Sequence, residues 1–379
     1  MSNLEEKKIY ARATDPIYVG TGGYTIGRVD NTIVRDPITK IPKIPGSSLA
    51  GTWRYYVALE LQAAFKDEYK MDREKRKEKK DNIAELFNNP KNWMINFDGN
   101  RFASINCAGK DDLPNKTIEE MEKEENSGHC GHCIVCKAFG YSKSNKSWQG
   151  MLLFSDLNIL FFPVYTRLGT KWITSQRILK EAGILKENLN EGENEKTNTI
   201  FVQEEIDKDK TEGFINLGWL NLPYKIKQFN IDLSNINDID EKDIIIVPDS
   251  LIAQIINSNL EVRTSVSIDP ITGAAKEQAL FTSEAIPRGT IFYGSIRLFD
   301  KSGLENKPEN KSKNGDKNSS QSSSDNIRNA LNDTKKYYET LGIGGMTTRG
   351  FGRMKILTNL QNNDDNNDAD GGDKNGTES

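Results

Sequence analysis

Alternating and continuous apolar runs predict β-strands at several places along the chain. We expect strands over residues 7–13 and 17–20, two more within residues 150–164, and others over 167–175 and 214–224. Two β-prone arms flank Asp269-Pro-Ile-Thr-Gly273, whose composition is typical of a turn, so this segment predicts a hairpin. Residues 226–242 are too mixed for an assignment. Helical spacing predicts helices within residues 326–341 and 47–65, the latter carried by Leu49, Trp53, Val57 and Leu61.

The segment that opens the first helix has the composition of an anion site. Pro45-Gly46 forms a turn, and Ser47 or Ser48 is a suitable N-cap. The first helical turn then carries free backbone N–H groups, two hydroxyls and little bulk, and Gly51 lets another backbone come close. A phosphate fits such a helix start, although an ordinary capped amphipathic helix explains the same pattern.

Two further segments are rich in glycine and polar residues. Residues 20–37 lack clear periodicity, so we expect a surface loop long enough to be functional, with Asp36 as part of a turn. Residues 341–356 run from the second helix into a last strand and contain Arg349 and Arg353. Backbone N–H groups beside two guanidinium groups are a suitable cradle for phosphate.

The cysteines predict a metal centre. Cys130, Cys133 and Cys136 lie within seven residues, and both histidines of the chain flank them. Tetrahedral zinc takes four ligands of this kind at this spacing. We expect Cys107 as the fourth ligand because it uses every cysteine, with His129 as the alternative, and buried thiols as the competing interpretation. The ion should be structural, since it ties down an insertion that has little core of its own.

Charge restricts where nucleic acid can bind. The net charge is −4, but residues 361–379 hold six acids and one lysine, which leaves the remainder near +1. Any RNA site must therefore be a local patch, and the charged residues 66–80 are best explained as a solvated helical extension. Residues 301–325 and the tail have low-complexity composition and are expected to be disordered.

No apolar run reaches the length of a membrane span, and residues 1–8 lack the apolar region of a signal peptide. We therefore expect a cytoplasmic protein with no membrane partner. Cysteines in that compartment are metal ligands or buried thiols rather than disulfides.

Three segments together resemble the RAMP superfamily, the RNA-binding proteins of CRISPR interference complexes. They are Ile44-Pro-Gly-Ser-Ser-Leu-x-Gly-x-x-Arg54, the hairpin segment 262–293, and the glycine-rich loop 341–356. They follow one another in family order between about residues 11 and 357, and Ser155-Asp with Phe162-Pro163 is similar to a further core segment of the family. The likeness is greatest to the repeated backbone subunit of type III complexes of the Cmr and Csm types.

The resemblance implies an α+β fold with a ferredoxin-like (RRM-like) core. Residues 1–359 would form a single RAMP domain, with a zinc-bearing finger insertion at about 66–140 and a β-hairpin thumb at about 262–293. The low-complexity segment 301–325 would be a loop of this domain, and residues 360–379 would be a disordered acidic tail.

The resemblance also implies a function. A backbone subunit binds CRISPR guide RNA, stacks head-to-tail with copies of itself beside other type III subunits, and cleaves target RNA paired with the guide. The endoribonuclease would use Asp30, within Gly27-Arg-Val-Asp-Asn31, and a divalent cation, Mg²⁺ by expectation, with Asp36 as the competing carboxylate. The RNA-binding residues implied are Lys43, Gly46, Ser47, Ser48, Arg54, Arg263, Gly344, Gly345, Arg349, Gly350 and Arg353.

Two alternatives within the same superfamily remain. One is a catalytically inactive scaffold that only binds RNA, and an aspartate at the position of Asp30 favours the enzyme over it. The other is a guide-processing ribonuclease. Such enzymes usually rely on histidine as general base, and both histidines here flank the cysteines.

Overall fold

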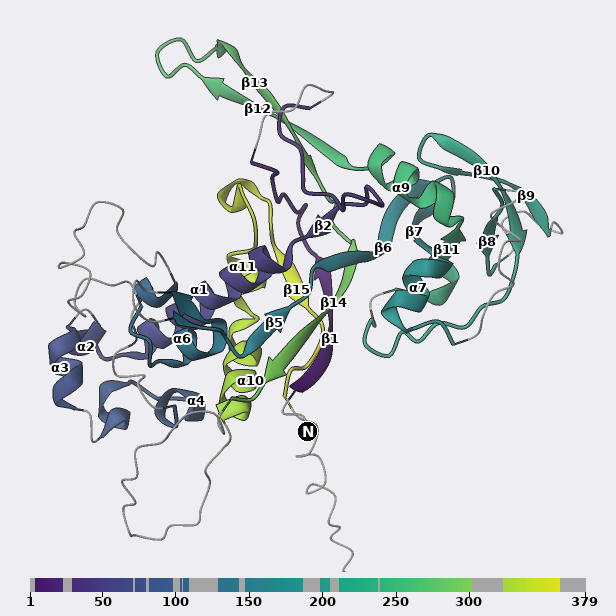
Figure 1. Cartoon of the computed structure of the whole chain (residues 1–379). Helices are drawn as coiled ribbons and strands as arrows, with labels where there is room; N and C mark the ends of the chain where they lie inside the picture. The colour runs from purple at the N-terminus through teal and green to yellow at the C-terminus, as the bar shows by residue number, and fades with distance from the viewer. Residues whose placement is uncertain are drawn as a thin grey trace, which may run out of the picture.

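An 11-stranded sheet extends through the molecule, and among the described residues two further strand pairs lie outside it (Figure 1). The computed structural model describes residues 4–22, 29–70, 72–79, 82–97, 103, 105–108, 129–142, 147–186, 198–204, 211–237, 239–301 and 323–361. Of the segments expected to be disordered, residues 302–322 and 362–379 lie outside the described residues, as does Gly27. No helix in the described ranges is both long enough and apolar enough to cross a bilayer.

The first half of the sheet is antiparallel throughout. Its order is β15-β1-β14-β6, with β5 beside β14 and β2 beside β6. The strands are β1 (Leu4–Ala13), β2 (Lys43–Ile44), β5 (Leu152–Phe154), β6 (Leu157–Thr166), β14 (Ile291–Phe299) and β15 (Met354–Ile356). The predicted first strand is confirmed, whereas its expected continuation at 17–20 forms only isolated bridges, such as Ile17 with Ile286.

Helix α1 (Gly46–Ala64) lies beside α10 (Ser323–Thr334) against this half of the sheet (Figure 1). The predicted apolar face is confirmed, because Leu49, Trp53, Val57 and Leu61 are all buried. The Trp53 indole donates to the Leu331 carbonyl oxygen at 3.3 Å and to the Thr334 hydroxyl at 3.1 Å, which fixes the two helices together. The helix predicted within 326–341 is two helices, since α10 ends at Thr334 and α11 (Tyr337–Thr340) follows.

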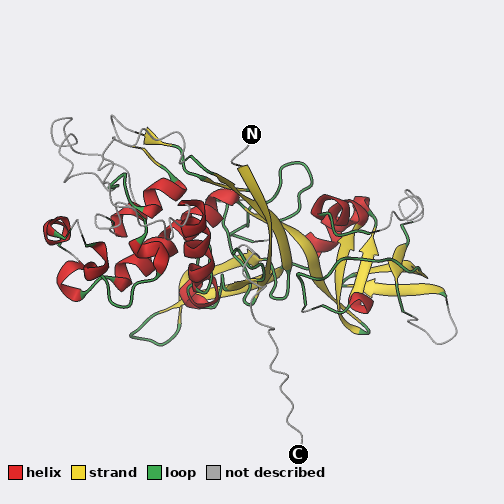
Figure 2. Ribbon diagram, turned by 90° about the horizontal axis from the view of Figure 1, so that it is seen from below, coloured by secondary structure: helices red, strands yellow, loops and turns green. Residues whose placement is uncertain are grey.

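The second half of the sheet is mixed, in the order β6-β7-β11-β8-β10-β9. It comprises β7 (Gly169–Ser175), β8 (Ile200–Val202), β9 (Glu212–Leu217), β10 (Leu220–Ile226) and β11 (Ile244–Val247), with α7 (Gln176–Ala182), η5 (Glu241–Asp243) and α9 (Asp249–Ser258). Viewed from below, this half and its helices occupy the end of the molecule opposite the main group of helices (Figure 2). The sequence analysis did not predict β11 or α9. Strand β11 has four residues that are all buried, so it shows no alternation of apolar and polar positions.

Short helices form the region expected to be the finger insertion. They are α2 (Asp67–Lys70), α3 (Arg73–Glu78), η1 (Ile83–Leu86), α4 (Asn92–Ile95), η3 (Ile105–Ala108) and α6 (Ile134–Phe139), followed by the pair β3 (Tyr141–Ser142) and β4 (Ser147–Trp148). The charged segment is largely helical, but it is not wholly solvated. Arg76 is buried, with its guanidinium 4.9 Å from the centre of the Phe65 ring and bonded to the Tyr69 and Lys70 carbonyl oxygens.

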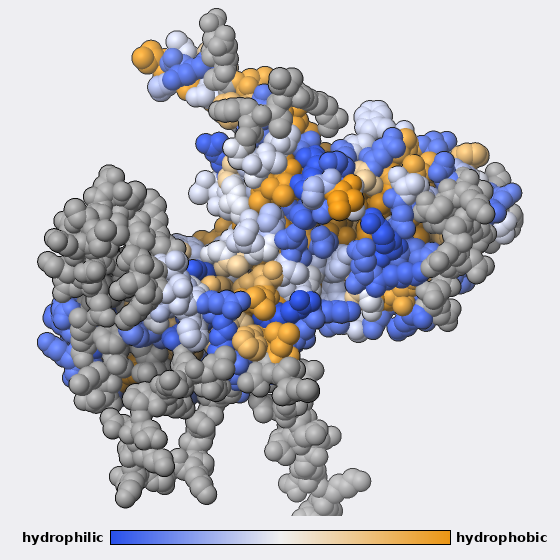
Figure 3. Space-filling model, viewed as in Figure 1, coloured by the Kyte–Doolittle hydropathy of each residue, from blue (hydrophilic) through white to orange (hydrophobic). Residues whose placement is uncertain are grey.

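A hairpin of β12 (Glu261–Ile268) and β13 (Ala275–Ala285) projects from the body of the molecule (Figure 1). Its turn is the predicted one: the Asp269 carboxylate accepts hydrogen bonds from the backbone amides of Ile271 at 2.7 Å and Thr272 at 3.2 Å. The tip of the hairpin presents apolar side chains to solvent (Figure 3), with Ile271 92% exposed.

The start of α1 differs from the sequence prediction. The helix begins at Gly46 after Pro45, and neither Ser47 nor Ser48 is the N-cap. The capping group comes instead from the connection between β5 and β6, because Asp156 accepts a hydrogen bond from the Gly46 amide at 2.8 Å. The helix start lies so close to the chain before β6 that a Cβ atom on Gly46 would be 2.8 Å from the Phe154 carbonyl oxygen.

We expect Gly46→Ala to lower the free energy of unfolding by about 1–3 kcal/mol, because backbone atoms must shift to admit the methyl group. Gly51→Ala is the matched control. Gly51 lies in the same helix with open space around its Cβ position, so alanine there should stabilise by roughly 0.5–1 kcal/mol. Denaturant unfolding of the three proteins measures both effects, and equal midpoints for the two variants would contradict the close contact.

Candidate functional site

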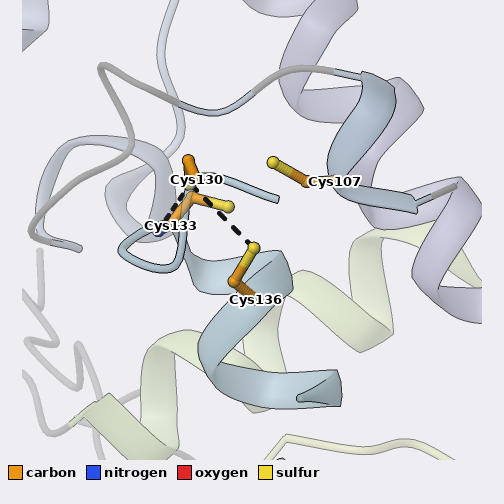
Figure 4. Close-up of side chains that lie close together, drawn as sticks. All are labelled: Cys107, Cys130, Cys133 and Cys136. Carbon is orange, nitrogen blue, oxygen red and sulfur yellow. Dashed lines mark hydrogen bonds between the residues drawn. The ribbon is translucent and has the colours of Figure 1, made fainter. Parts of the chain in front are cut away.

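Four buried cysteine side chains converge beside α1 (Figure 4). The sulfur atoms of Cys107, Cys130, Cys133 and Cys136 all lie within 4.8 Å of one another. Cys107 comes from η3, Cys130 and Cys133 from the loop before α6, and Cys136 from α6 itself. Four buried thiols at this separation are able to hold a structural metal ion, and their soft sulfur donors suit zinc.

His129 lies next to this cysteine cluster. Its Nδ1 is 3.8 Å from the Cys136 sulfur and 3.0 Å from Nη2 of Arg54. The sulfur of Cys107 lies within 4.8 Å of the other three cysteine sulfurs, so the geometry favours Cys107 over His129 as the fourth ligand. The thiols differ in their surroundings: hydrogen bonds from the other three cysteines lower the pKa of Cys107, whereas burial raises the pKa of Cys133. A bound cation favours the thiolate form of all its ligands.

Arg54 points into the cysteine cluster. Its Nε donates to the Cys107 carbonyl oxygen at 2.8 Å, and its Nη2 lies against His129. One helical side chain thus contacts the two segments that bring cysteines together. The family resemblance implies Arg54 as an RNA contact, whereas in the structure this half-buried side chain is engaged with groups around the cysteines.

A cavity of about 460 Å³ separates the first turns of α1 from the glycine-rich loop. Its lining residues are Gly51, Thr52, Tyr55, Tyr56, Leu341, Gly342, Ile343, Gly344 and Thr347. Ser48 lies one turn before Gly51 and Thr52 on the same side of the helix. We call this cavity the helix–loop groove. Hydroxyl groups and loop backbone surround it, which is the lining expected for a polar, extended ligand.

Glycine is required where the loop packs against the chain that follows β1. Gly344 has φ +82°, and a Cβ atom there would lie 2.1 Å from the Tyr18 carbonyl oxygen. The neighbouring Gly345 amide donates to the same oxygen at 2.9 Å. The loop backbone is therefore held close to the body of the protein next to the helix–loop groove.

The structure brings several other predicted RNA contacts to this loop. Arg263, at the base of the hairpin, donates to the Gly350 carbonyl oxygen at 3.2 Å and lies 4.6 Å from the centre of the Phe351 ring. Arg349 is exposed at the end of η6 (Thr347–Arg349). Arg353 instead pairs with Asp15.

Lys43 and Asp36 form an ion-pair cluster at the entrance to α1. The Lys43 ammonium is 2.7 Å from Asp156 and 3.4 Å from Asp36, and the hydrogen bond that it donates to Asp156 raises the pKa of Lys43. Asp36 accepts hydrogen bonds from the Thr39 amide at 2.9 Å and the Ile38 amide at 3.0 Å. The hydrogen bonds from these two backbone amides lower the pKa of Asp36 to about 2. Asp36 thus closes a turn, in agreement with its Asp-Pro-Ile-Thr context.

Asp30 is exposed at the base of the hairpin. Its Oδ2 accepts hydrogen bonds from the Thr282 amide at 2.8 Å and from the Thr282 hydroxyl at 3.0 Å, and these bonds lower the pKa of Asp30. The adjoining Asn31 exchanges backbone hydrogen bonds with strand β13. Asp30 and Asn31 are thereby attached to the hairpin, a long-range contact that no local pattern predicts.

Comparison with known proteins identifies relatives. The model of the RAMP superfamily matches residues 10–355. Two proteins named CRISPR system Cms endoribonuclease Csm3 match parts of the chain: one from Mycobacterium tuberculosis at 33% identity over 112 residues, and one from Methanothermobacter thermautotrophicus at 44% over 54 residues. The matches cover 28% and 14% of this chain, and only 44% and 22% of those relatives.

One solved structure, of the type III-B Cmr-beta complex bound to cognate target RNA, contains a chain with a similar fold. The TM-score is 0.51 at 13% sequence identity, over 94% of this chain and 98% of that chain. The likeness concerns the fold, because identity is this low.

Metal analysis of the purified protein should find about one zinc ion per chain, because the four sulfurs form a single tetrahedral-type set. Cys107→Ser and Cys133→Ser should each lower the zinc content and loosen the finger region to proteolysis. His129→Gln is the matched control and should retain the ion. A folded, protease-resistant protein without metal would contradict the assignment, and metal loss in His129→Gln alone would make histidine the ligand.

Proposed function

Because the chain belongs to the RAMP superfamily, we propose that it is a guide-RNA-binding backbone subunit of a type III CRISPR interference complex that cleaves complementary target RNA. The observation that carries this proposal is the position of the helix–loop groove. The glycine-rich loop lines the groove and also accepts a hydrogen bond from Arg263 of the hairpin. Strand β13 of the same hairpin donates a hydrogen bond to Asp30. The two Csm3 relatives, which are named endoribonucleases, support the nuclease part of the proposal.

We assign the first half of the sheet and its two helices to a ferredoxin-like palm within a single RAMP domain. Support comes from the antiparallel order β15-β1-β14-β6, with α1 between β1 and β5 in sequence and α10 between β14 and β15. This order supports the β-α-β-β-α-β arrangement of that fold. The finger region of about residues 66–140 and the hairpin, as thumb, are then insertions into the palm.

Guide RNA is assigned to the helix–loop groove. The Thr52 hydroxyl and the loop backbone line the groove and offer donors to phosphate without reading base identity. Ser48, one helical turn earlier, and the exposed Arg349 at the end of η6 would extend this set beyond the lining. Tyr55, which is 43% exposed, offers a ring on which a base can stack. Sequence specificity would then come from pairing between guide and target.

The guide also sets the expected partners. A subunit that contacts a short stretch of guide must repeat to cover its length, so we assign copies of this chain in a head-to-tail filament, together with other type III subunits in the cytoplasm. The Cmr-beta structure, which is bound to cognate target RNA, supports an RNA-bound assembly at the level of the fold. The structural zinc would hold the finger region in the shape that such a filament requires.

Asp30 is the proposed catalytic residue. The RNA 2′-hydroxyl attacks the adjacent phosphorus while the P–O5′ bond breaks, and the departing 5′-oxygen takes a proton from water. The products therefore carry a 2′,3′-cyclic phosphate and a 5′-hydroxyl. The carboxylate would orient the hydroxyl and accept its proton. Within the described ranges, no group of three or more potential metal ligands includes Asp30. A divalent cation, Mg²⁺ by proposal, would thus be held chiefly by RNA phosphates, and when bound it would neutralise charge on the phosphate.

The inactive scaffold remains the alternative, and Asp30 is the residue that decides between the two. A guide-processing ribonuclease ranks third. One of its potential general bases, His129, is buried against Arg54 and the cysteines rather than placed at the groove.

Arg349→Ala should weaken guide-RNA binding similarly for every sequence and reduce the slope of log K against log salt by roughly 0.7–1, because one phosphate contact is lost. Arg54→Ala is the informative comparison, because its guanidinium is engaged at the cysteines. It should leave the salt slope unchanged and lower the zinc content. Filter binding at several salt concentrations measures the slopes. A reduced slope of log K against log salt in Arg54→Ala would show that Arg54 contacts RNA.

Asp30→Ala in the assembled complex should abolish target cleavage while guide and target binding persist, because the carboxylate acts in the chemical step. Asp36→Ala serves as control, since Asp36 closes a turn, and it should still cut. Labelled target RNA reports cleavage and its end groups, and gel shifts report binding. Normal cleavage by Asp30→Ala would refute the catalytic assignment. If Asp36→Ala were inactive at the same time, Asp36 would be the catalytic residue.

A further inference from the structure

Asp30 and Thr282 are joined by reciprocal hydrogen bonds across 252 residues of sequence. The Asp30 amide donates to the Thr282 hydroxyl oxygen at 3.1 Å, while the same hydroxyl and the Thr282 amide both donate to Oδ2 of Asp30. Threonine can fill both roles because its hydroxyl donates one hydrogen and accepts another. We propose that Thr282, on hairpin strand β13, is a positioning residue that fixes the Asp30 carboxylate for RNA cleavage.

This inference rests on the proposed function and adds a residue to it. The two bonds from Thr282 end on one carboxylate oxygen, Oδ2. The other oxygen, Oδ1, accepts neither of them and belongs to an exposed side chain, so it is the oxygen available to the RNA. Fixing one oxygen orients the other, which is what an in-line reaction demands of its catalytic group.

The backbone around this pair makes the loop and the hairpin one unit. The Asn31 amide donates to the Thr282 carbonyl oxygen and the Glu284 amide donates to the Asn31 carbonyl oxygen, each at 3.0 Å. Arg35 then pairs with the Glu284 carboxylate at 2.8 Å. Asp30 therefore moves with the base of the hairpin, so any RNA that displaces the hairpin also displaces the carboxylate.

The local electrostatics follow from the same contacts. Hydrogen bonds from the amide and then the hydroxyl of Thr282 lower the pKa of Asp30, which keeps the carboxylate ionised to lower pH. Two ion pairs lie on the paired elements near this contact, Arg35 with Glu284 and Arg263 with Glu261. Removing the Thr282 hydroxyl should raise the pKa of Asp30 towards its ordinary value, so the loss of cleavage on acidification should begin at higher pH.

The test compares Thr282→Val with Thr282→Ser in the assembled complex. Valine keeps the size and the backbone amide but lacks the hydroxyl, so cleavage should slow roughly ten- to a hundredfold, with guide and target binding preserved. The acid side of its pH–rate profile should shift upward. Serine restores the hydroxyl and should recover most of the rate and the original profile.

Thr264→Val is the matched control. Thr264 pairs directly with Thr282 across the hairpin, so both side chains lie on the same face of its two strands. It has no hydrogen bond to Asp30 among the described contacts, and its valine variant should cleave at the normal rate. Equal slowing in both valine variants would overturn the proposal, because the threonines would then act through the RNA or the hairpin itself.

The outcomes separate this inference from the proposed function. If Asp30→Ala stops cleavage while Thr282→Val cuts normally with an unshifted pH profile, Thr282 has no positioning role and the proposed function stands. If Asp30→Ala cuts normally, the catalytic assignment fails and the role of Thr282 fails with it. Slow cleavage by Thr282→Val that serine does not rescue would also overturn the proposal.

Discussion

The contact between the start of α1 and the chain before β6 is the constraint on which the rest of the structure depends. Gly46 has no room for a side chain because the Phe154 and Ser155 carbonyl oxygens lie against it, and Asp156 accepts the bond from its amide. A charged cap on a helix amide is a strong and directional link. It sets both the position of α1 along the sheet and its rotation, and therefore decides which side chain faces which neighbour.

Three sides of this one helix serve three purposes. Trp53 fixes α10, Arg54 reaches the cysteine cluster, and Thr52 with Tyr55 lines the helix–loop groove. The proposed guide site and the candidate metal centre are therefore neighbours on a rigid element, although they are separate in chemistry. A metal ion among the cysteines would act on the groove only through the packing of the helix.

The hairpin has a comparable double role. Its exposed tip is apolar, whereas its base is bonded through Thr282 to Asp30 and through Arg263 to the glycine-rich loop. In the proposed function, the hairpin would therefore also hold the catalytic carboxylate in place. Cleavage would then depend on where the base of the hairpin lies, because Thr282 supplies the hydrogen bonds described for the Asp30 carboxylate.

The sequence by itself determined the features that a local pattern encodes. These include the periodic face of α1, the Asp269 turn, the spacing of Cys130, Cys133 and Cys136, and the family to which the chain belongs. Periodicity and turn chemistry depend on neighbours within a few residues, so they are visible in the sequence. The tertiary structure alone decided how Arg54 is used, that Asp156 caps a helix 110 residues earlier, and that Thr282 holds Asp30. Those pairings follow from the order of strands in the sheet and the docking of the hairpin, which no local spacing records.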